Sequence, residues 1–205
     1  QSKIVNINNI FKFYQSDIGK RMKKAIYSFI YYRILGWKSV VTVPNYDKCV
    51  ICAAPHTSNE DLFIGKLFYG AQGRKTSFMM KKDWFFFPLG IIFRAMGGIP
   101  VDRSRKTSLV DQMAKHFQES KKFHLAITPE GTRKANPNWK KGFYYIALKA
   151  NVPIVLIGID YEKKVITETK AVIPTGDIDK DMREIKLYFR DFKGKNPENF
   201  DLGEL

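Results

Sequence analysis

The chain has 205 residues, of which 44% are hydrophobic and 14% aromatic. This composition excludes a disordered chain, and the length suits a single domain that buries most of its apolar surface. Thirty-five Lys and Arg residues against 20 Asp and Glu give a formal net charge of +15. We therefore expect an anionic partner, which nucleic acid, an acidic membrane or a phosphorylated substrate would satisfy.

The N-terminal segment, residues 1–38, combines positive charge with aromatic side chains. Four cations in residues 19–24 precede a largely apolar helical stretch that Trp37 and Lys38 close. This order is typical of an amphipathic helix in a membrane interface, and the alternative is an ordinary helix packed on the domain. Since no apolar run reaches the roughly 20 residues of a spanning helix, we expect peripheral or monotopic association with the cytoplasmic face of an anionic membrane.

From residue 39 onward, short apolar runs alternate with segments of helical periodicity. The predicted strands are 39–43, 48–54, 76–80, 98–101, 123–128, 153–160 and 165–173. The predicted helices are 59–71, 85–95, 107–121, 141–150 and 177–192. This alternation predicts an α/β domain over residues 39–193, with a mostly parallel twisted sheet flanked by helices. We expect the charged tail, residues 194–205, to be loose.

The two cysteines, Cys49 and Cys52, fall in one predicted strand. Positions three apart on a strand point to opposite faces, so the thiols should diverge rather than share a metal or a redox bond. We expect both to be buried and reduced, which suits a cytosolic compartment.

In a parallel sheet, binding sites lie beyond the carboxyl ends of the strands, and His56 and Asp61 follow strand 48–54 at that edge. Five positions on one helix would set the two side chains about 140° apart, so they can meet only if His56 stands on the turn before the helix. The carboxylate would then fix the imidazole tautomer while the other ring nitrogen takes a proton from a hydroxyl. Alternatively, Ser58-x-x-Asp61 and Thr57-x-x-Glu60 fit capping boxes, in which the acids serve the helix start.

Two further loops at the same edge carry arginines. Arg103 follows strand 98–101, and Arg133 follows Glu130 and Gly131 after strand 123–128. Two guanidinium forks from separate strands make a good phosphate clamp, whereas each taken alone is an ordinary solvated surface charge. Glu130 would accept a hydrogen bond from a hydroxyl or hold an arginine, and Gly131 allows a tight turn.

Four motifs in order give the chain a family resemblance. They are His56-x4-Asp61, Gly98-Ile99-Pro100-Val101-Asp102-Arg103, Pro129-Glu130-Gly131-Thr132-Arg133 and Val152-Pro153-Ile154-Val155. Together they span about 100 residues, 54–155, and the chain resembles the PlsC-type glycerolipid acyltransferases, the lysophosphatidic acid acyltransferase superfamily. The chain departs from the family's pattern at Pro55, where Asn is frequent, and at Lys134, where Ser is common.

The resemblance implies an O-acyltransferase of phospholipid biosynthesis. It would move a fatty acyl group from acyl carrier protein or coenzyme A to the hydroxyl of a lysophospholipid, most favourably 1-acylglycerol-3-phosphate, to give phosphatidate. His56 would be the general base and Asp61 its orienting partner. The residues implied to hold or shape the acceptor phosphate site are Arg103, Glu130, Gly131, Thr132 and Arg133.

The resemblance also assigns roles to two other segments. Lys81 is a candidate for the oxyanion or the phosphate, and Val152, Pro153 and Ile154 are candidates for placing the acyl chain, with a buried strand as their alternative. No metal or redox cofactor is implied.

Other functions stay open from the sequence. One alternative is an acyltransferase that acts on another lysolipid or an aminolipid acceptor. A second alternative is a non-catalytic basic module that binds lipid or nucleic acid. The chain contains no recognised nucleic-acid motif, so we expect no nucleic acid partner. A hydrolase would need a nucleophile, and no Gly-x-Ser-x-Gly elbow is present.

Overall fold

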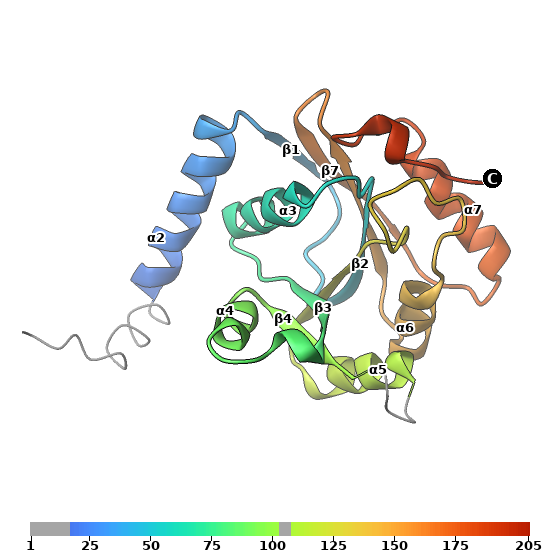
Figure 1. Cartoon of the computed structure of the whole chain (residues 1–205), viewed down its shortest axis with the longest axis horizontal. Helices are drawn as coiled ribbons and strands as arrows, with labels where there is room; N and C mark the ends of the chain where they lie inside the picture. The colour runs from blue at the N-terminus through green and yellow to red at the C-terminus, as the bar shows by residue number, and fades with distance from the viewer. Residues whose placement is uncertain (1–16, 103–107) are drawn as a thin grey trace, which may run out of the picture.

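A computed structural model describes residues 17–102 and 108–205 and contains the predicted α/β architecture (Figure 1). Within these residues one sheet has the strand order β1-β7-β6-β2-β5-β3-β4. The strands are β1 (Lys38–Val41), β2 (Lys48–Ala54), β3 (Ser77–Lys81), β4 (Gly98–Val101), β5 (Phe123–Ile127), β6 (Ile154–Asp160) and β7 (Val165–Val172). Strands β2 to β6 run parallel, while β7 is antiparallel to β6 and parallel to β1. The mostly parallel sheet is therefore confirmed.

Helices cover both faces of this sheet. They are α2 (Asp17–Ser28) with its π-helical continuation η1 (Phe29–Ile34), α3 (Glu60–Ala71), α4 (Leu89–Ala95), α5 (Leu109–Glu119), α6 (Gly142–Ala150) and α7 (Ile178–Phe189), with short 3₁₀ turns η2 (Lys82–Trp84) and η3 (Pro197–Asn199). Helix α4 begins later than the predicted residue 85, because Pro88 cannot occupy a helix interior and stands at its N-cap instead.

Two hydrophobic cores lie on opposite faces of the sheet. One contains side chains of α5, α6 and α7, and the other contains side chains of α3 and η1. Cys52 belongs to the first core and Cys49 to the second, and both thiols are free and buried. The predicted divergence of the two cysteines is confirmed.

Helix α2 packs on α3 with one side only. The ring of Tyr27 lies so close to Gly70 that a Cβ there would be 2.4 Å from it. The opposite side of the helix continues into η1 and exposes a row of apolar residues, namely Ile18, Met22, Ile26 and Phe29. The predicted amphipathic N-terminal helix is therefore present. None of the described helices has the length and apolar character needed to span a bilayer.

The C-terminal segment, residues 194–205, is packed on the domain, so the prediction of a loose tail was wrong. Asn196 donates from its backbone N–H to Thr57 Oγ1 at 3.1 Å and from Nδ2 to Thr57 O at 2.8 Å. Phe200 packs against the core beside Trp139, with ring centroids 6.2 Å apart. The apolar residues of this charged segment thus pack against the core.

Candidate active site

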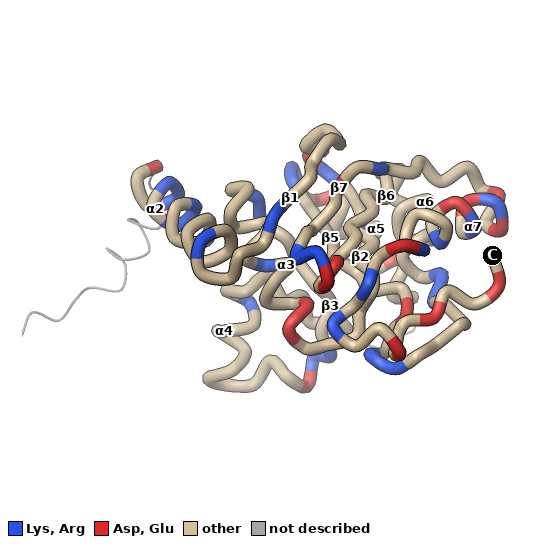
Figure 2. Tube along the Cα trace, turned by 90° about the horizontal axis from the view of Figure 1, so that it is seen from above, with Lys and Arg blue, Asp and Glu red and all other residues tan. Residues whose placement is uncertain are grey.

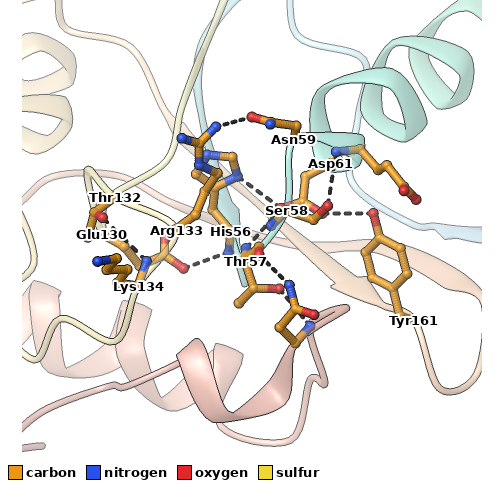
Figure 3. Close-up of polar contacts among 12 residues, drawn as sticks. His56, Thr57, Ser58, Asn59, Asp61, Glu130, Thr132, Arg133, Lys134 and Tyr161 are labelled. Carbon is orange, nitrogen blue, oxygen red and sulfur yellow. Dashed lines mark hydrogen bonds and ion pairs between the residues drawn. The ribbon is translucent and has the colours of Figure 1, made fainter.

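His56 stands on the loop between β2 and α3, where the chain has left the sheet and not yet entered the helix. Its Nδ1 lies 2.9 Å from Oδ2 of Asp61, so the two side chains meet as the spacing required (Figure 3). Because Nδ1 is the nitrogen that faces the carboxylate, it carries the proton, and Nε2 is the nitrogen that can accept one.

The carboxylate of Asp61 is the organising group of this loop. Its Oδ2 also accepts the backbone N–H groups of Thr57 and Ser58, both at 2.9 Å, and its Oδ1 accepts the hydroxyl of Tyr161 at 2.7 Å. The side chain is only 4% exposed. Asp61 therefore holds the turn before the helix and orients the imidazole, so both interpretations of this carboxylate describe part of its role.

Tyr161 is a site residue that the sequence analysis missed. It follows β6, a neighbour of β2 in the sheet, and Trp37 packs against its ring edge-on with centroids 5.0 Å apart. Burial, together with the hydrogen bond to Asp61, raises the pKa of the Tyr161 hydroxyl, so this group stays a proton donor to the carboxylate.

Glu130 lies beneath the same loop rather than in a phosphate pocket. Its Oε1 accepts the backbone N–H of His56 at 2.8 Å, and its Oε2 has no hydrogen-bond partner among the described residues. The residue is 2% exposed, and this burial raises the pKa of the carboxyl group to about 7. Glu130 therefore supports the backbone of the histidine.

Arg133 is the arginine that the structure brings to the site. Its Nη1 donates to Oδ1 of Asn59, three residues after His56, and both Arg133 and Thr132 are exposed (Figure 3). Gly131 adopts φ +66°, the left-handed conformation that favours glycine, which confirms the expected tight turn. Arg103, the other half of the predicted clamp, lies outside the described residues.

Of the four other predicted site residues, Lys81 ends β3 at the same edge of the sheet as His56, and the other three lie elsewhere. Lys81 is exposed and pairs with Asp83 at 2.5 Å. Val152 and Ile154 are buried in the core at the start of β6, with Pro153 between them, and the backbone O of Pro153 accepts the N–H of Val50. These three residues lie at the amino end of the strands, whereas His56 follows the carboxyl end, so they correspond to the buried-strand alternative.

A cavity of about 410 Å³ extends from His56 into the space between α3 and the sheet. Its apolar lining includes Ile51, Ala53, Leu62, Gly65, Phe78, Ala126 and Ile157. The small side chains of Ala53 and Ala126, and the absence of one at Gly65, leave this space open. The volume and the mostly apolar lining are those of a small-molecule pocket.

Lys66 places a cation on the wall of this cavity, five residues beyond Asp61 and thus about 7.5 Å further along the helix axis. Its Nζ donates to the backbone O of Thr76 at 2.6 Å and to Thr76 Oγ1 at 3.2 Å. Burial, and secondarily the positive charge of Lys23, lower the pKa of the ammonium group to about 8. The cavity is therefore lined by the polar His56–Asp61 pair at one end and by a cation further in.

Comparisons with known proteins agree with this geometry. A family model described as Acyltransferase matches residues 39–160, and a search of curated proteins finds no match. The fold is similar to the crystal structure of the 1-acyl-sn-glycerophosphate (LPA) acyltransferase PlsC from Thermotoga maritima, with a TM-score of 0.58 and 16% identity over 85% of this chain and 80% of that chain. Such low identity shows a shared fold, whereas the family model covers more than half of the sequence. The chain therefore belongs to the acyltransferase family and has the fold of PlsC.

Proposed function

We propose that the protein transfers a fatty acyl group from a thioester, acyl carrier protein or coenzyme A, to the hydroxyl of a lysophospholipid. The favoured acceptor is 1-acylglycerol-3-phosphate, which gives phosphatidate. One observation carries the proposal: the His56–Asp61 pair stands at an apolar cavity, with the Arg133 guanidinium held beside it through Asn59.

His56 acts on the acceptor hydroxyl. Nε2 takes the proton while the hydroxyl oxygen attacks the thioester carbonyl and forms the new C–O bond. The tetrahedral intermediate then collapses, the C–S bond breaks, and the proton passes from Nε2 to the leaving thiolate. Asp61 stabilises the imidazolium during these steps, and general base catalysis of this kind typically contributes about 10²- to 10⁴-fold. The reaction as proposed uses no metal or redox cofactor, and it gives Lys81 no role.

The cavity under α3 holds the transferred acyl chain. A chain lying there removes its methylenes from water, which contributes about 0.8 kcal/mol for each buried CH₂ group. The carbonyl carbon then stays beside His56, because this residue lines the same cavity as the apolar side chains.

The acceptor phosphate binds at Arg133. This side chain is exposed and lies next to the loop of His56, so a phosphate bound there leaves the acceptor hydroxyl near Nε2. Arg133→Ala should chiefly raise the acceptor KM, because the charged hydrogen bonds to phosphate are lost. An unchanged KM would argue against this role.

The exposed apolar row of α2 and its four cations fit an anionic membrane surface, so we place the reaction at the cytoplasmic face of a membrane. Each cation near an anionic leaflet contributes about 1 kcal/mol. This location gives the enzyme access to a lysolipid that already resides in the bilayer.

An acyl-transfer assay tests the proposal directly. Both thioester donors are offered against a panel of lysophospholipids and lyso-aminolipids, and the products are identified by lipid mass spectrometry. His56→Ala should abolish transfer while the melting temperature and liposome binding stay unchanged. Full activity in this variant would refute the assignment, and product formation from a lyso-aminolipid alone would select that acceptor instead.

The same preparation distinguishes a non-catalytic basic module. Filter binding to nucleic acid at moderate salt should give no retention beyond that of an unrelated protein of similar charge. Tight retention that persists in salt, together with no acyl transfer, would favour the binding module.

A further inference from the structure

Residues 84–92, between β3 and β4, carry a cluster of exposed large apolar side chains. The exposed fraction is 82% for Phe87, 62% for Ile91 and 52% for Trp84, and Phe86 and Ile92 are more than half exposed as well. Soluble monomers rarely present so many large apolar side chains together, and such a patch marks an interaction site. These residues are not among those that line the cavity beside His56.

The outward direction of these side chains is fixed by packing. Phe85 and Phe93 meet edge-on beneath the segment, with centroids 6.1 Å apart, and the Arg94 guanidinium lies 5.2 Å from the Phe85 ring. Gly90 is pressed against Phe85, since a Cβ there would lie 2.5 Å from its backbone O. The segment thus has an inner side that attaches it to the domain and an outer side that is left uncovered.

Cations border the exposed side chains. Residues 81–95 contain Lys81, Lys82 and Arg94 against the single carboxylate of Asp83. Apolar rings bordered by exposed cations are the pattern of a segment that enters the headgroup boundary of an anionic bilayer.

The segment lies at the same end of the molecule as α2 (Figures 1 and 2). Helix α3 lies between them, since it packs against α2, and Nζ of its residue Lys66 would lie 3.2 Å from a Cβ at Gly97, two residues after α4. Figures 1 and 2 both place α2 and α4 at the same end of the molecule, and Figure 2 shows the cations along α2. The apolar row of α2 and residues 84–92 therefore belong to one end of the protein.

We propose that residues 84–92 are a second membrane-binding surface, which inserts Trp84, Phe87 and Ile91 into an anionic phospholipid bilayer at the same end of the molecule as α2. A second copy of this chain is a poorer occupant. Lys81, Lys82 and Arg94 border the surface against the two carboxylates of Asp83 and Asp102, so a two-fold contact would bring an excess of positive charge from both copies together. Lipid binding at this surface does not depend on acyl transfer, and it can be measured with no thioester donor present.

Trp84 provides a direct probe of insertion. The chain has 3 tryptophans, and Trp37 and Trp139 are buried at 5% and 6% exposure, whereas Trp84 is exposed. Vesicles of phosphatidylglycerol and phosphatidylcholine should shift the emission to shorter wavelength, and brominated phosphatidylcholine in these vesicles should quench it. Trp84→Phe should remove both effects. Bound protein whose Trp84 emission is neither shifted nor quenched would overturn the proposal.

Vesicle flotation measures the contribution to binding. The double variant Phe87→Ser with Ile91→Ser should partition into the anionic vesicles about tenfold less than the parent, because two apolar side chains no longer enter the boundary. Ile173→Ser is the matched control, since Ile173 is also 62% exposed but lies after β7, and it should bind as the parent does. Equal partitioning of the double variant, or a parent dimer that the double variant converts to monomer, would overturn the proposal. Repeating both measurements in His56→Ala keeps this result separate from the proposed catalysis.

Discussion

Tyr161→Phe tests whether the hydrogen bond from the Tyr161 hydroxyl to Asp61 is needed for catalysis. The substitution removes one hydroxyl, which donates to Oδ1 of Asp61 at 2.7 Å, and leaves three donors on Oδ2. A hydrogen bond to a charged group contributes about 1.5 to 3 kcal/mol, and we expect the lower end because the carboxylate keeps its other partners. Since about 1.36 kcal/mol corresponds to a tenfold change in rate, kcat should fall about tenfold.

The assay follows thiol release at saturating acceptor and donor, and KM should stay unchanged because Tyr161 is not among the residues lining the cavity. Tyr188→Phe is the control, since it removes a hydroxyl that donates to Thr167 O on the other face of the sheet. The control should keep its kcat. A Tyr161→Phe enzyme with full kcat, or one that changes only KM, would refute the idea that this hydroxyl positions Asp61 for catalysis.

Three further changes test the surroundings of the catalytic loop and the cavity. Gly194→Ala should lower kcat at least tenfold, because the new Cβ would lie 2.6 Å from Thr57 Oγ1 and must displace the loop. Gly142→Ala is the control, since a Cβ there meets open space, and its kcat should not fall. Equal rates in the two variants would contradict this reasoning. From pH 5 to pH 8 the unfolding free energy of Glu130→Gln should rise by about 2 kcal/mol relative to that of the parent, as measured by urea unfolding. The reason is that the folded pKa of about 7 lies above the ordinary value of 4.5, so the parent loses stability as pH rises through this window; a constant difference would show that the carboxyl titrates normally. In a competition among thioesters, Lys66→Met should raise the preference for the longer acyl chain about tenfold, because the methyl end of that chain no longer meets an ammonium group. An unchanged product distribution would place the acyl chain elsewhere.

The strands and the contact between His56 and Asp61 could be predicted because their signals are local. Apolar runs of strand length bounded by Pro and Gly located every strand within two residues of its observed ends. Helix geometry gave the condition under which His56 and Asp61 can meet, a turn before the helix, and the family resemblance implied that they do. These features depend on residues that are close in the sequence, so periodicity and spacing determine them.

Tyr161 could not be predicted because its partner is 100 positions away. It reaches Asp61 only because β6 returns to lie beside β2, and nothing in the residues around position 161 encodes this register. The packed tail was missed for a related reason, since its many charges conceal the apolar Phe200 that Trp139 covers. Signals for such contacts exist only when the order of the strands is known.

The placement of Val152 to Ile154 could have been predicted. A parallel sheet collects binding residues at the carboxyl ends of its strands, and this segment precedes β6, so the rule that located His56 also excludes the segment from the site. The cavity itself had a weaker signal in the sequence, which is the pair of small residues Ala53 and Ala126 on adjacent strands facing Gly65 of α3.

The loop of His56 is held by three elements that are distant in the chain. Glu130 after β5 accepts its first backbone N–H, Tyr161 after β6 bonds the carboxylate that orients the ring, and Asn196 of the tail fixes Thr57. A base must lie within hydrogen-bonding reach of the proton it takes, and a short loop without such supports would sample positions that are too loose for this. The proposed chemistry of His56 and Asp61 therefore depends on polar groups that do not line the cavity, and substitutions in the tail should act through the histidine.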